Sequence, residues 1–352
     1  MDRTIHKILE DKNLLNLKNI FFSIEQSHIG LGKLFLFDYL CELANECLLV
    51  VGSPATGKSI STTTLFNYIP RAKLKLDAIT VSGLRKIAKE LSNNTVSIIV
   101  DDLSKGQTVY SQVATVSVLS SLVYSGTIVK ITQQLNINII NFKGSAIINL
   151  QPLLLKRIVN LDEFETDIRD KTMRYYHLHF PINEQVTQPK LNNKLVFKYV
   201  DEHLPLEIKD DKLFDDTLEN FRYEFSKARA KEHMMKLLSA SALANNRKKI
   251  LDSDVKLLHH YSKLFRLENE LFRKRHLEGK RKLNVDILPL ISILNSYEKL
   301  TIDDLRIRFG LSKARTYEII SELSDYVLHL KGKSLLRPTE KTYQILREIG
   351  EL

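Results

Sequence analysis

The stretch that decides the fold is residues 48–59, which read LLVVGSPATGKS. The apolar run Leu48–Val51 is typical of a buried strand, and it leads directly into a loop that begins at Gly52 and ends at Ser59. The loop fits the pattern Gly-x-x-x-x-Gly-Lys-Ser, and a helical pattern follows from Ile60. Such a loop binds nucleotide phosphates, because its backbone N–H groups and the N-terminus of the following helix face the anion.

The side chains of this loop predict a site for ATP and Mg²⁺. We expect Lys58 to reach the β- and γ-phosphates and Ser59 to bind Mg²⁺. The residues expected to surround the phosphates are Gly52, Ser53, Pro54, Ala55, Thr56, Gly57, Lys58 and Ser59.

A second motif, residues 96–102, reads VSIIVDD and has the composition of a buried strand that ends in two carboxylates. An acidic pair at the end of a strand often only caps a turn. Because the phosphate-binding loop lies upstream, we expect Asp101 to hold Mg²⁺ through water and Asp102 to act as the base that polarises the attacking water.

The wider pattern predicts an α/β fold, because short β-rich runs alternate with helical stretches between Cys47 and Pro181. The predicted strands are Leu48–Val51, Ala78–Thr80, Ser97–Val100, Ala146–Leu150 and Tyr175–Phe180. The predicted divisions are an N-terminal helical segment (1–45), a P-loop core (46–182), a linker (183–212), a helical lid with a basic tract (213–282) and a C-terminal domain (283–352).

The C-terminal domain has the spacing of a winged helix-turn-helix. We expect helices over 285–297, 301–309 and 313–323, then a β-hairpin over 327–337 and a last helix from Glu340. Between Arg306 and Arg337 seven basic residues oppose three acidic ones, which favours DNA binding over a protein-docking role. The residues expected to contact DNA are Ser312, Lys313, Arg315, Thr316, Lys331 and Lys333.

Composition narrows the class of protein. A net charge of +10 favours polyanionic partners, and 43% hydrophobic residues with 27% charged ones is ordinary globular usage. Two cysteines, Cys41 and Cys47, are too few for a disulfide framework, which fits a cytoplasmic location. No apolar run is long enough for a membrane span. His177, His179 and the pair at 259–260 have no metal-ligand spacing, and we expect ordinary core or surface positions for them.

The two motifs together resemble those of AAA+ ATPases, and residues 126–131 and 141–152 look like the hairpin and strand before sensor 1 in the minichromosome-maintenance group. The resemblance implies that Gln151, or alternatively Asn149, senses the γ-phosphate. It likewise implies a sensor 2 role for Arg229. For an arginine finger that acts on a neighbouring subunit, it points to Arg174, with Arg169 and Arg157 as alternatives.

This resemblance implies a self-associating ATPase, as a ring or arc and most simply a hexamer. The order of core, lid and winged helix is also similar to that of origin initiators. We therefore expect an ATPase that remodels or moves along DNA in replication, as initiator, helicase loader or helicase. Two alternatives stay open: an ATP-switched transcription or mobile-element regulator, and a protein-remodelling ATPase.

Overall fold

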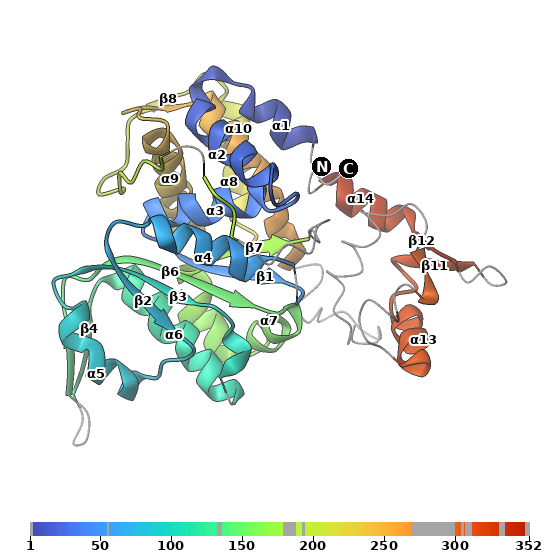
Figure 1. Cartoon of the computed structure of the whole chain (residues 1–352), viewed down its shortest axis with the longest axis horizontal. Helices are drawn as coiled ribbons and strands as arrows, with labels where there is room; N and C mark the ends of the chain where they lie inside the picture. The colour runs from blue at the N-terminus through green and yellow to red at the C-terminus, as the bar shows by residue number, and fades with distance from the viewer. Residues whose placement is uncertain are drawn as a thin grey trace.

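A five-stranded parallel sheet forms the centre of the molecule, in the order β2-β3-β6-β1-β7 (Figure 1). Its strands are β1 (Cys47–Gly52), β2 (Ala72–Leu76), β3 (Thr95–Val100), β6 (Lys143–Leu150) and β7 (Met173–His177). The computed structural model describes residues 3–54, 56–106, 108–131, 136–178, 188–191, 194–268, 300–303, 306, 312–330 and 335–348. The parallel sheet with helices on both faces confirms the expected α/β class, and it is compatible with a P-loop type of fold.

The order of the strands gathers three predicted site segments at one edge. Because all five strands are parallel, their carboxyl ends meet there: the loop at 52–59 follows β1, Asp101 follows β3 and Gln151 follows β6. β6 lies between β1 and β3, so two inter-strand spacings, about 10 Å, separate the loop from Asp101. That separation leaves room for a phosphate chain and a cation.

Helices cover both faces of the sheet (Figure 1). On one face lie α3 (Gly32–Leu43) and α4 (Lys58–Tyr68), and on the other α6 (Val109–Ser125) and α7 (Pro152–Ile158). Every residue of α3 is buried, because this helix is enclosed between the sheet and a second layer of helices. Most of its residues are apolar, and its buried carboxylates have partners: Asp38 accepts from the Ser61 hydroxyl (2.6 Å), and Glu42 pairs with Arg71 (2.8 Å).

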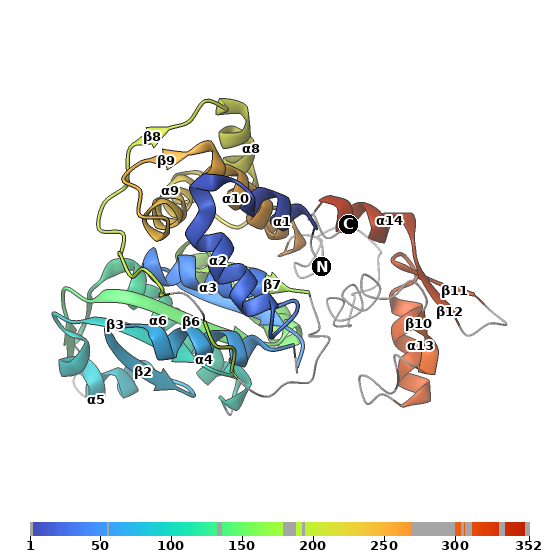
Figure 2. The same ribbon diagram turned by 45° about the horizontal axis from the view of Figure 1, so that its top comes forward.

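The second layer joins the start of the chain to the predicted lid (Figure 2). Its helices are α1 (Arg3–Leu9), α2 (Leu15–Glu25), α8 (Asp211–Phe221), α9 (Lys227–Ala244) and α10 (Asp252–Ser262). The backbone N–H of Asn16 donates to the Asn245 side chain (3.1 Å), and the Tyr261 hydroxyl donates to the Lys33 carbonyl (2.9 Å). Residues 1–45 thus pack on the lid and the core together.

The remaining elements before the C-terminal region are smaller. They are the strand pairs β4 (Ile128–Ile131) with β5 (Asn136–Ile139) and β8 (Leu206–Glu207) with β9 (Ile250–Leu251), the helix α5 (Val81–Leu91), and the helical turns η1 (Lys12–Leu14), η2 (Leu103–Lys105), η3 (Phe164–Ile168), η4 (Arg169–Lys171) and η5 (Lys263–Phe265). β4 and β5 form the antiparallel hairpin that the sequence indicates before β6.

One predicted strand is wrong. Residues 78–80 precede α5, and the Thr80 side chain accepts a hydrogen bond from the Gly83 N–H as the cap of that helix. The edge strand is β2, whose sequence AKLKL alternates exposed and half-buried positions. The two lysines at exposed positions interrupt the apolar run that would mark a strand in the sequence. Charged residues of this kind are common on an edge strand.

The described C-terminal elements form a small antiparallel sheet with two helices. The strands are β10 (Leu300–Thr301), β11 (Val327–Leu330) and β12 (Leu335–Pro338), in the order β10-β12-β11, and the helices are α13 (Lys313–Glu322) and α14 (Glu340–Glu348). The hairpin and the last helix are confirmed as elements, and β10 was not expected. The helix expected at 285–297 and most of the one at 301–309 lie outside the described residues.

Within the described part of the chain, no helix combines the length and apolarity that crossing a bilayer requires.

Candidate functional site

The predicted phosphate-binding loop closes the carboxyl end of β1. Gly52 ends the strand, and Gly57 is the N-cap of α4. Its φ of +86° lies in the left-handed region, which glycine adopts without steric cost. The positive φ favours glycine there, and a Cβ at Gly57 would also lie 2.7 Å from a methyl carbon of Leu31, which would have to shift. Pro54 and Ser59 are exposed, whereas Ala55 lies outside the described residues.

The carbonyl groups of this loop point into the protein and are hydrogen-bonded. Lys58 Nζ donates to the carbonyls of Gly52 and Ser53, each at 2.6 Å, and the Thr56 hydroxyl also donates to Ser53 (2.8 Å). The Lys58 ammonium therefore lies inside the loop, where a phosphate oxygen could replace the carbonyls as its partner.

The N-terminal segment contributes a side chain to the loop that the sequence did not indicate. Leu31 is buried and contacts Gly57, while the Glu25 carboxylate accepts hydrogen bonds from the N–H groups of Gly30 and Gly32 (2.7 Å from the latter). The only signal in the sequence is the pair of glycines around Leu31. Residues 1–45 match no motif, so nothing in the sequence connects these two glycines with the phosphate-binding loop.

Asp101 and Asp102 differ in what they contact. Asp101 Oδ1 is buried and meets no hydrogen-bond donor among the described residues, and Oδ2 lies 3.6 Å from Lys75 Nζ. Asp102 accepts a hydrogen bond from the Ser104 N–H (2.9 Å) as the cap of η2. The unpaired oxygen of Asp101 fits a cation site, whereas Asp102 performs the capping role that an acidic pair often has.

Gln151 and Asn149 are separated by their depth in the sheet. Gln151 follows β6 at the carboxyl edge and is half-buried, and no capping hydrogen bond engages its side chain. Asn149 is buried within β6, and its amide donates to the Thr62 hydroxyl (3.0 Å), which itself donates to the Lys58 carbonyl (3.2 Å). Gln151 therefore suits a contact with the nucleotide, and Asn149 supports the first turn of α4.

Arg174 does not fit the role of an arginine finger. Its side chain is 0% exposed, and its Nε lies 2.5 Å from Glu268 and 3.6 Å from Glu224, both also 0% exposed. Burial works against the charge, but the two carboxylates raise the pKa of the guanidinium above its usual value. A side chain enclosed in this way cannot reach a neighbouring subunit, so the expectation is corrected to a structural ion cluster.

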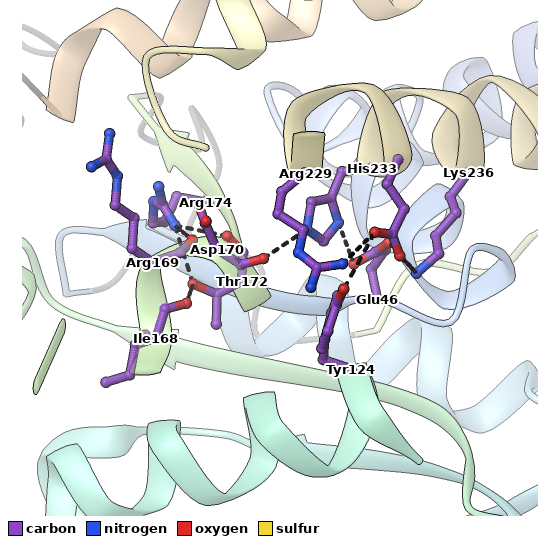
Figure 3. Close-up of polar contacts among 11 residues, drawn as sticks. Glu46, Tyr124, Ile168, Arg169, Asp170, Thr172, Arg174, Arg229, His233 and Lys236 are labelled. Carbon is purple, nitrogen blue, oxygen red and sulfur yellow. Dashed lines mark hydrogen bonds and ion pairs between the residues drawn. The ribbon is translucent and has the colours of Figure 1, made fainter. Parts of the chain in front are cut away.

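Arg229 is not brought to the phosphate-binding loop either. Figure 3 shows it on α9 beside His233 and Lys236, extending towards Tyr124, and its guanidinium pairs with Glu232 (2.8 Å). Its guanidinium lies 4.4 Å from the centre of the Tyr124 ring. Glu46 precedes β1, so this cluster marks the amino edge of the sheet, about 20 Å from the loop by the rise of a six-residue strand. The sensor 2 expectation is corrected accordingly.

The two alternative arginines differ in accessibility. Arg169, in η4, pairs with Glu165 (2.9 Å) and donates to the Glu224 carbonyl (3.0 Å). Arg157 is exposed near the end of α7, the helix that follows Gln151. Of the three arginines, Arg157 is therefore the one most accessible to another subunit.

The residues predicted to contact DNA also differ in their accessibility. Thr316 is buried and donates to the Ser312 carbonyl (2.9 Å), so it does not face a groove, which corrects its assignment. The Ser312 hydroxyl accepts from the Arg315 N–H (3.2 Å), and the Arg315 guanidinium pairs with Glu318 (2.6 Å). Lys313 is exposed at the start of α13. Lys331 and Lys333 lie outside the described residues.

A Mg²⁺ ion at this edge would depend on oxygens from outside the chain. Among the described residues no three His, Cys, Asp or Glu side chains form a group that could hold a metal. Ser59 and Asp101 are the protein oxygens expected to bind the ion, and Mg²⁺ commonly completes its six ligands with water and nucleotide phosphates. The residues present therefore fit a nucleotide-bound Mg²⁺ rather than a permanent metal site.

No protein-family model matches the chain, and no curated protein sequence is significantly similar to it. The function of the site has to be inferred from its own geometry.

Proposed function

We propose that the protein binds ATP with Mg²⁺ and hydrolyses it at the carboxyl edge of the central sheet. The observation that carries this proposal is the meeting of the loop after β1, Asp101 after β3 and Gln151 after β6 at one edge, with β6 between the other two strands. Carboxyl edges of parallel sheets are where such folds bind ligands. Three polar groups with different chemistry converge there.

Each group has a role in this proposal. The loop N–H groups and the start of α4 bind the phosphates, and Lys58 exchanges its carbonyl partners for the β- and γ-phosphates. Ser59 and Asp101 hold the Mg²⁺, which neutralises charge on the phosphates. Gln151 contacts the γ-phosphate. Asp102 orients the attacking water, for which it must give up or share its contact with the Ser104 N–H.

The experiment for this part is the rate of ATP hydrolysis in Lys58→Ala. We expect a loss of about 100- to 1,000-fold, because one preorganised electrostatic contact to the transition state is removed. Circular dichroism should stay unchanged. The matched control is Lys89→Ala, which removes an exposed lysine of α5 and should hydrolyse ATP as the wild-type protein does. Hydrolysis by Lys58→Ala at the wild-type rate would refute the proposed site.

For the assembled form we propose an arc or ring, most simply a hexamer, in which Arg157 of one subunit acts on the nucleotide of the next. The exposure of Arg157 supports it over the buried Arg174. Arg157→Ala and Lys58→Ala should each hydrolyse poorly alone, and a mixture should recover activity because one interface has both groups intact. No recovery after mixed assembly has been verified would reject Arg157.

We further propose that DNA is the partner and replication the process. Net charge +10, the resemblance to AAA+ ATPases with a winged helix, and the described α13, β11, β12 and α14 support DNA binding. Exposed Lys313 at the start of α13 is the contact that the described residues favour. Direct contacts by Lys331 and Lys333 belong to the same proposal.

Hydrolysis should be measured without DNA, with single-stranded DNA and with duplex, alongside strand displacement. A helicase or loader should be stimulated by DNA, and a helicase should also separate strands. Sequence-specific binding without stimulation would favour the transcription or mobile-element regulator. Absence of any nucleic-acid binding would favour the protein-remodelling ATPase.

A further inference from the structure

The last residue of β7, His177, lies directly behind the phosphate-binding loop. β7 pairs with β1, and His177 is opposite Gly52 in the register. A Cβ on Gly52 would come within 3.1 Å of the His177 carbonyl oxygen and 3.2 Å of its Cβ, so the two strands are in close contact here. The imidazole is 2% exposed, and its ring lies beside that of Tyr175, with 6.4 Å between the ring centres.

The imidazole contacts one particular carbonyl group of the loop. His177 Nε2 lies 2.9 Å from the carbonyl oxygen of Thr56. A carbonyl oxygen can only accept, so the hydrogen bond requires a proton on Nε2, and His177 is the donor. Nε2 therefore carries a proton whether the ring as a whole is neutral or charged.

The contact orients a peptide group that faces the proposed phosphates. The described peptide bonds are trans, and in a trans peptide the C=O and the next N–H point in opposite directions. Holding the Thr56 carbonyl towards β7 therefore turns the Gly57 N–H away from β7. Gly57 is the N-cap of α4, the position from which a backbone N–H reaches an anion at a helix start.

Two other carbonyls of the loop, those of Gly52 and Ser53, accept hydrogen bonds from Lys58, which is also proposed to bind the phosphates. Lys58 holds the Gly52 carbonyl and shares the Ser53 carbonyl with the Thr56 hydroxyl, and its ammonium must leave both to bind phosphate. His177 is held in the sheet by the pairing of β7 with β1. It can keep the Thr56–Gly57 peptide in place while Lys58 changes partners.

We propose that His177 is a positioning residue of the nucleotide site, which holds the Thr56 carbonyl and so presents the Gly57 N–H to the phosphates of the bound nucleotide. This inference rests on the proposed ATP function. It assigns to His177 a role that its alternating strand pattern does not indicate.

The test is a pair of amide substitutions, His177→Gln and His177→Asn. The Gln side chain can place its N–H near the position of Nε2, whereas the shorter Asn cannot reach the Thr56 carbonyl. Both are polar at the same buried position, so they should cost the fold similar amounts. Affinity for Mg-ATP and for Mg-tripolyphosphate should be measured by calorimetric titration, with thermal unfolding of each variant in parallel.

We expect His177→Asn to weaken both ligands about tenfold or more, as when one hydrogen bond to a charged group is lost, and His177→Gln to stay within about threefold of wild type. The matched control is His260→Asn, which changes a buried histidine of α10 and should leave affinity unaltered. Equal affinities for His177→Asn, His177→Gln and wild type would overturn the proposal, as would equal weakening of both His177 variants at equal unfolding temperature.

The same titration separates this failure from failure of the proposed function. Wild-type binding that is lost in Lys58→Ala but retained in His177→Asn rejects the role of His177 and leaves the site standing. Absence of binding by the wild-type protein rejects both. If His177→Asn does not fold, a wild-type affinity of His177→Leu, which also lacks the donor, would overturn the proposal, and a tenfold loss beside an unimpaired His177→Gln would support it.

Discussion

At the carboxyl edge of the central sheet the two carboxylates that follow β3 are partly accessible, whereas the ion clusters of Arg174 and of Glu46 near its amino edge are buried and paired. Asp101 keeps 20% of its side chain exposed and has one oxygen that meets no donor among the described residues. At the opposite edge, Arg174, Glu224 and Glu268 are fully buried together, and His233 is enclosed between Glu46 and the Asp170 carbonyl. Charges of the first kind can bind a ligand, and those of the second kind hold residues 224–268 to the core.

The largest expected loss of stability is that of Arg174→Met. Removing the guanidinium leaves Glu224 and Glu268 buried without their cation, so the free energy of unfolding should fall by about 3–5 kcal/mol. Urea unfolding followed by circular dichroism measures it. The exposed Arg157→Ala should stay within about 0.5 kcal/mol of wild type. A fully stable Arg174→Met protein that no longer hydrolyses ATP would return Arg174 to the finger role.

At the carboxyl edge, Asp102→Asn should reduce the rate of hydrolysis by about 100-fold, which is at the low end of the rate losses expected when a general base is removed. ATP should still bind. The amide oxygen of Asn can still accept from the Ser104 N–H, so the cap of η2 and the fold should be preserved. Single-turnover hydrolysis with prebound ATP measures this effect. Unchanged turnover would mean that capping η2 is the whole role of Asp102.

Acid should loosen the amino edge through Glu46. Burial opposes the charge of this carboxylate, but His233 and Lys236 hold its pKa below the usual value. Its stabilising effect is therefore present above the ordinary pKa of a glutamate and is lost as the pH falls through the lower pKa of the folded state. Glu46→Gln should lower stability at pH 7 by about 1–3 kcal/mol and flatten the acid dependence.

The control for Glu46 is Glu90→Gln, which changes an exposed carboxylate of α5 outside the cluster. Its unfolding curve should follow that of wild type from neutral pH into the acid range. Identical acid dependence of Glu46→Gln and wild type would contradict the coupling of Glu46 to His233 and Lys236.

The smallest effect is expected in the C-terminal region. If Lys313 contacts a DNA phosphate, Lys313→Ala should flatten the dependence of log affinity on log salt by about one unit for duplex of any sequence. Fluorescence anisotropy over a salt series measures that slope. An unaltered slope would remove Lys313 from the interface.

The sequence predicted what depends on local pattern. The loop at 52–59 and the strand that ends before Asp101 each have a short signature and lie where the pattern indicates, and the hairpin that the resemblance implied at 126–131 is present as β4 with β5. β2 was misplaced because its exposed lysines break the apolar run that marks a central strand.

The failures concern contacts between segments far apart in the chain. Arg174 and Arg229 were assigned by their order along the chain, but order does not reveal that Glu224 and Glu268 enclose the first or that Tyr124 lies under the second. The contacts of Leu31 with Gly57 and of His177 with Thr56 likewise arise from packing, because no sequence motif links those positions.

The central claim is that the carboxyl edge is a nucleotide site, and thermal unfolding with and without Mg-ATP tests it most directly. A ligand at 100 times its Kd stabilises the folded state by about 2.7 kcal/mol, so the wild-type protein should unfold at a clearly higher temperature when Mg-ATP is added. Arg174→Met should start from a lower temperature yet show the same upward shift, and Lys58→Ala should show none at the same concentration. An equal shift in Lys58→Ala and wild type, or no shift in the wild type, would contradict the account.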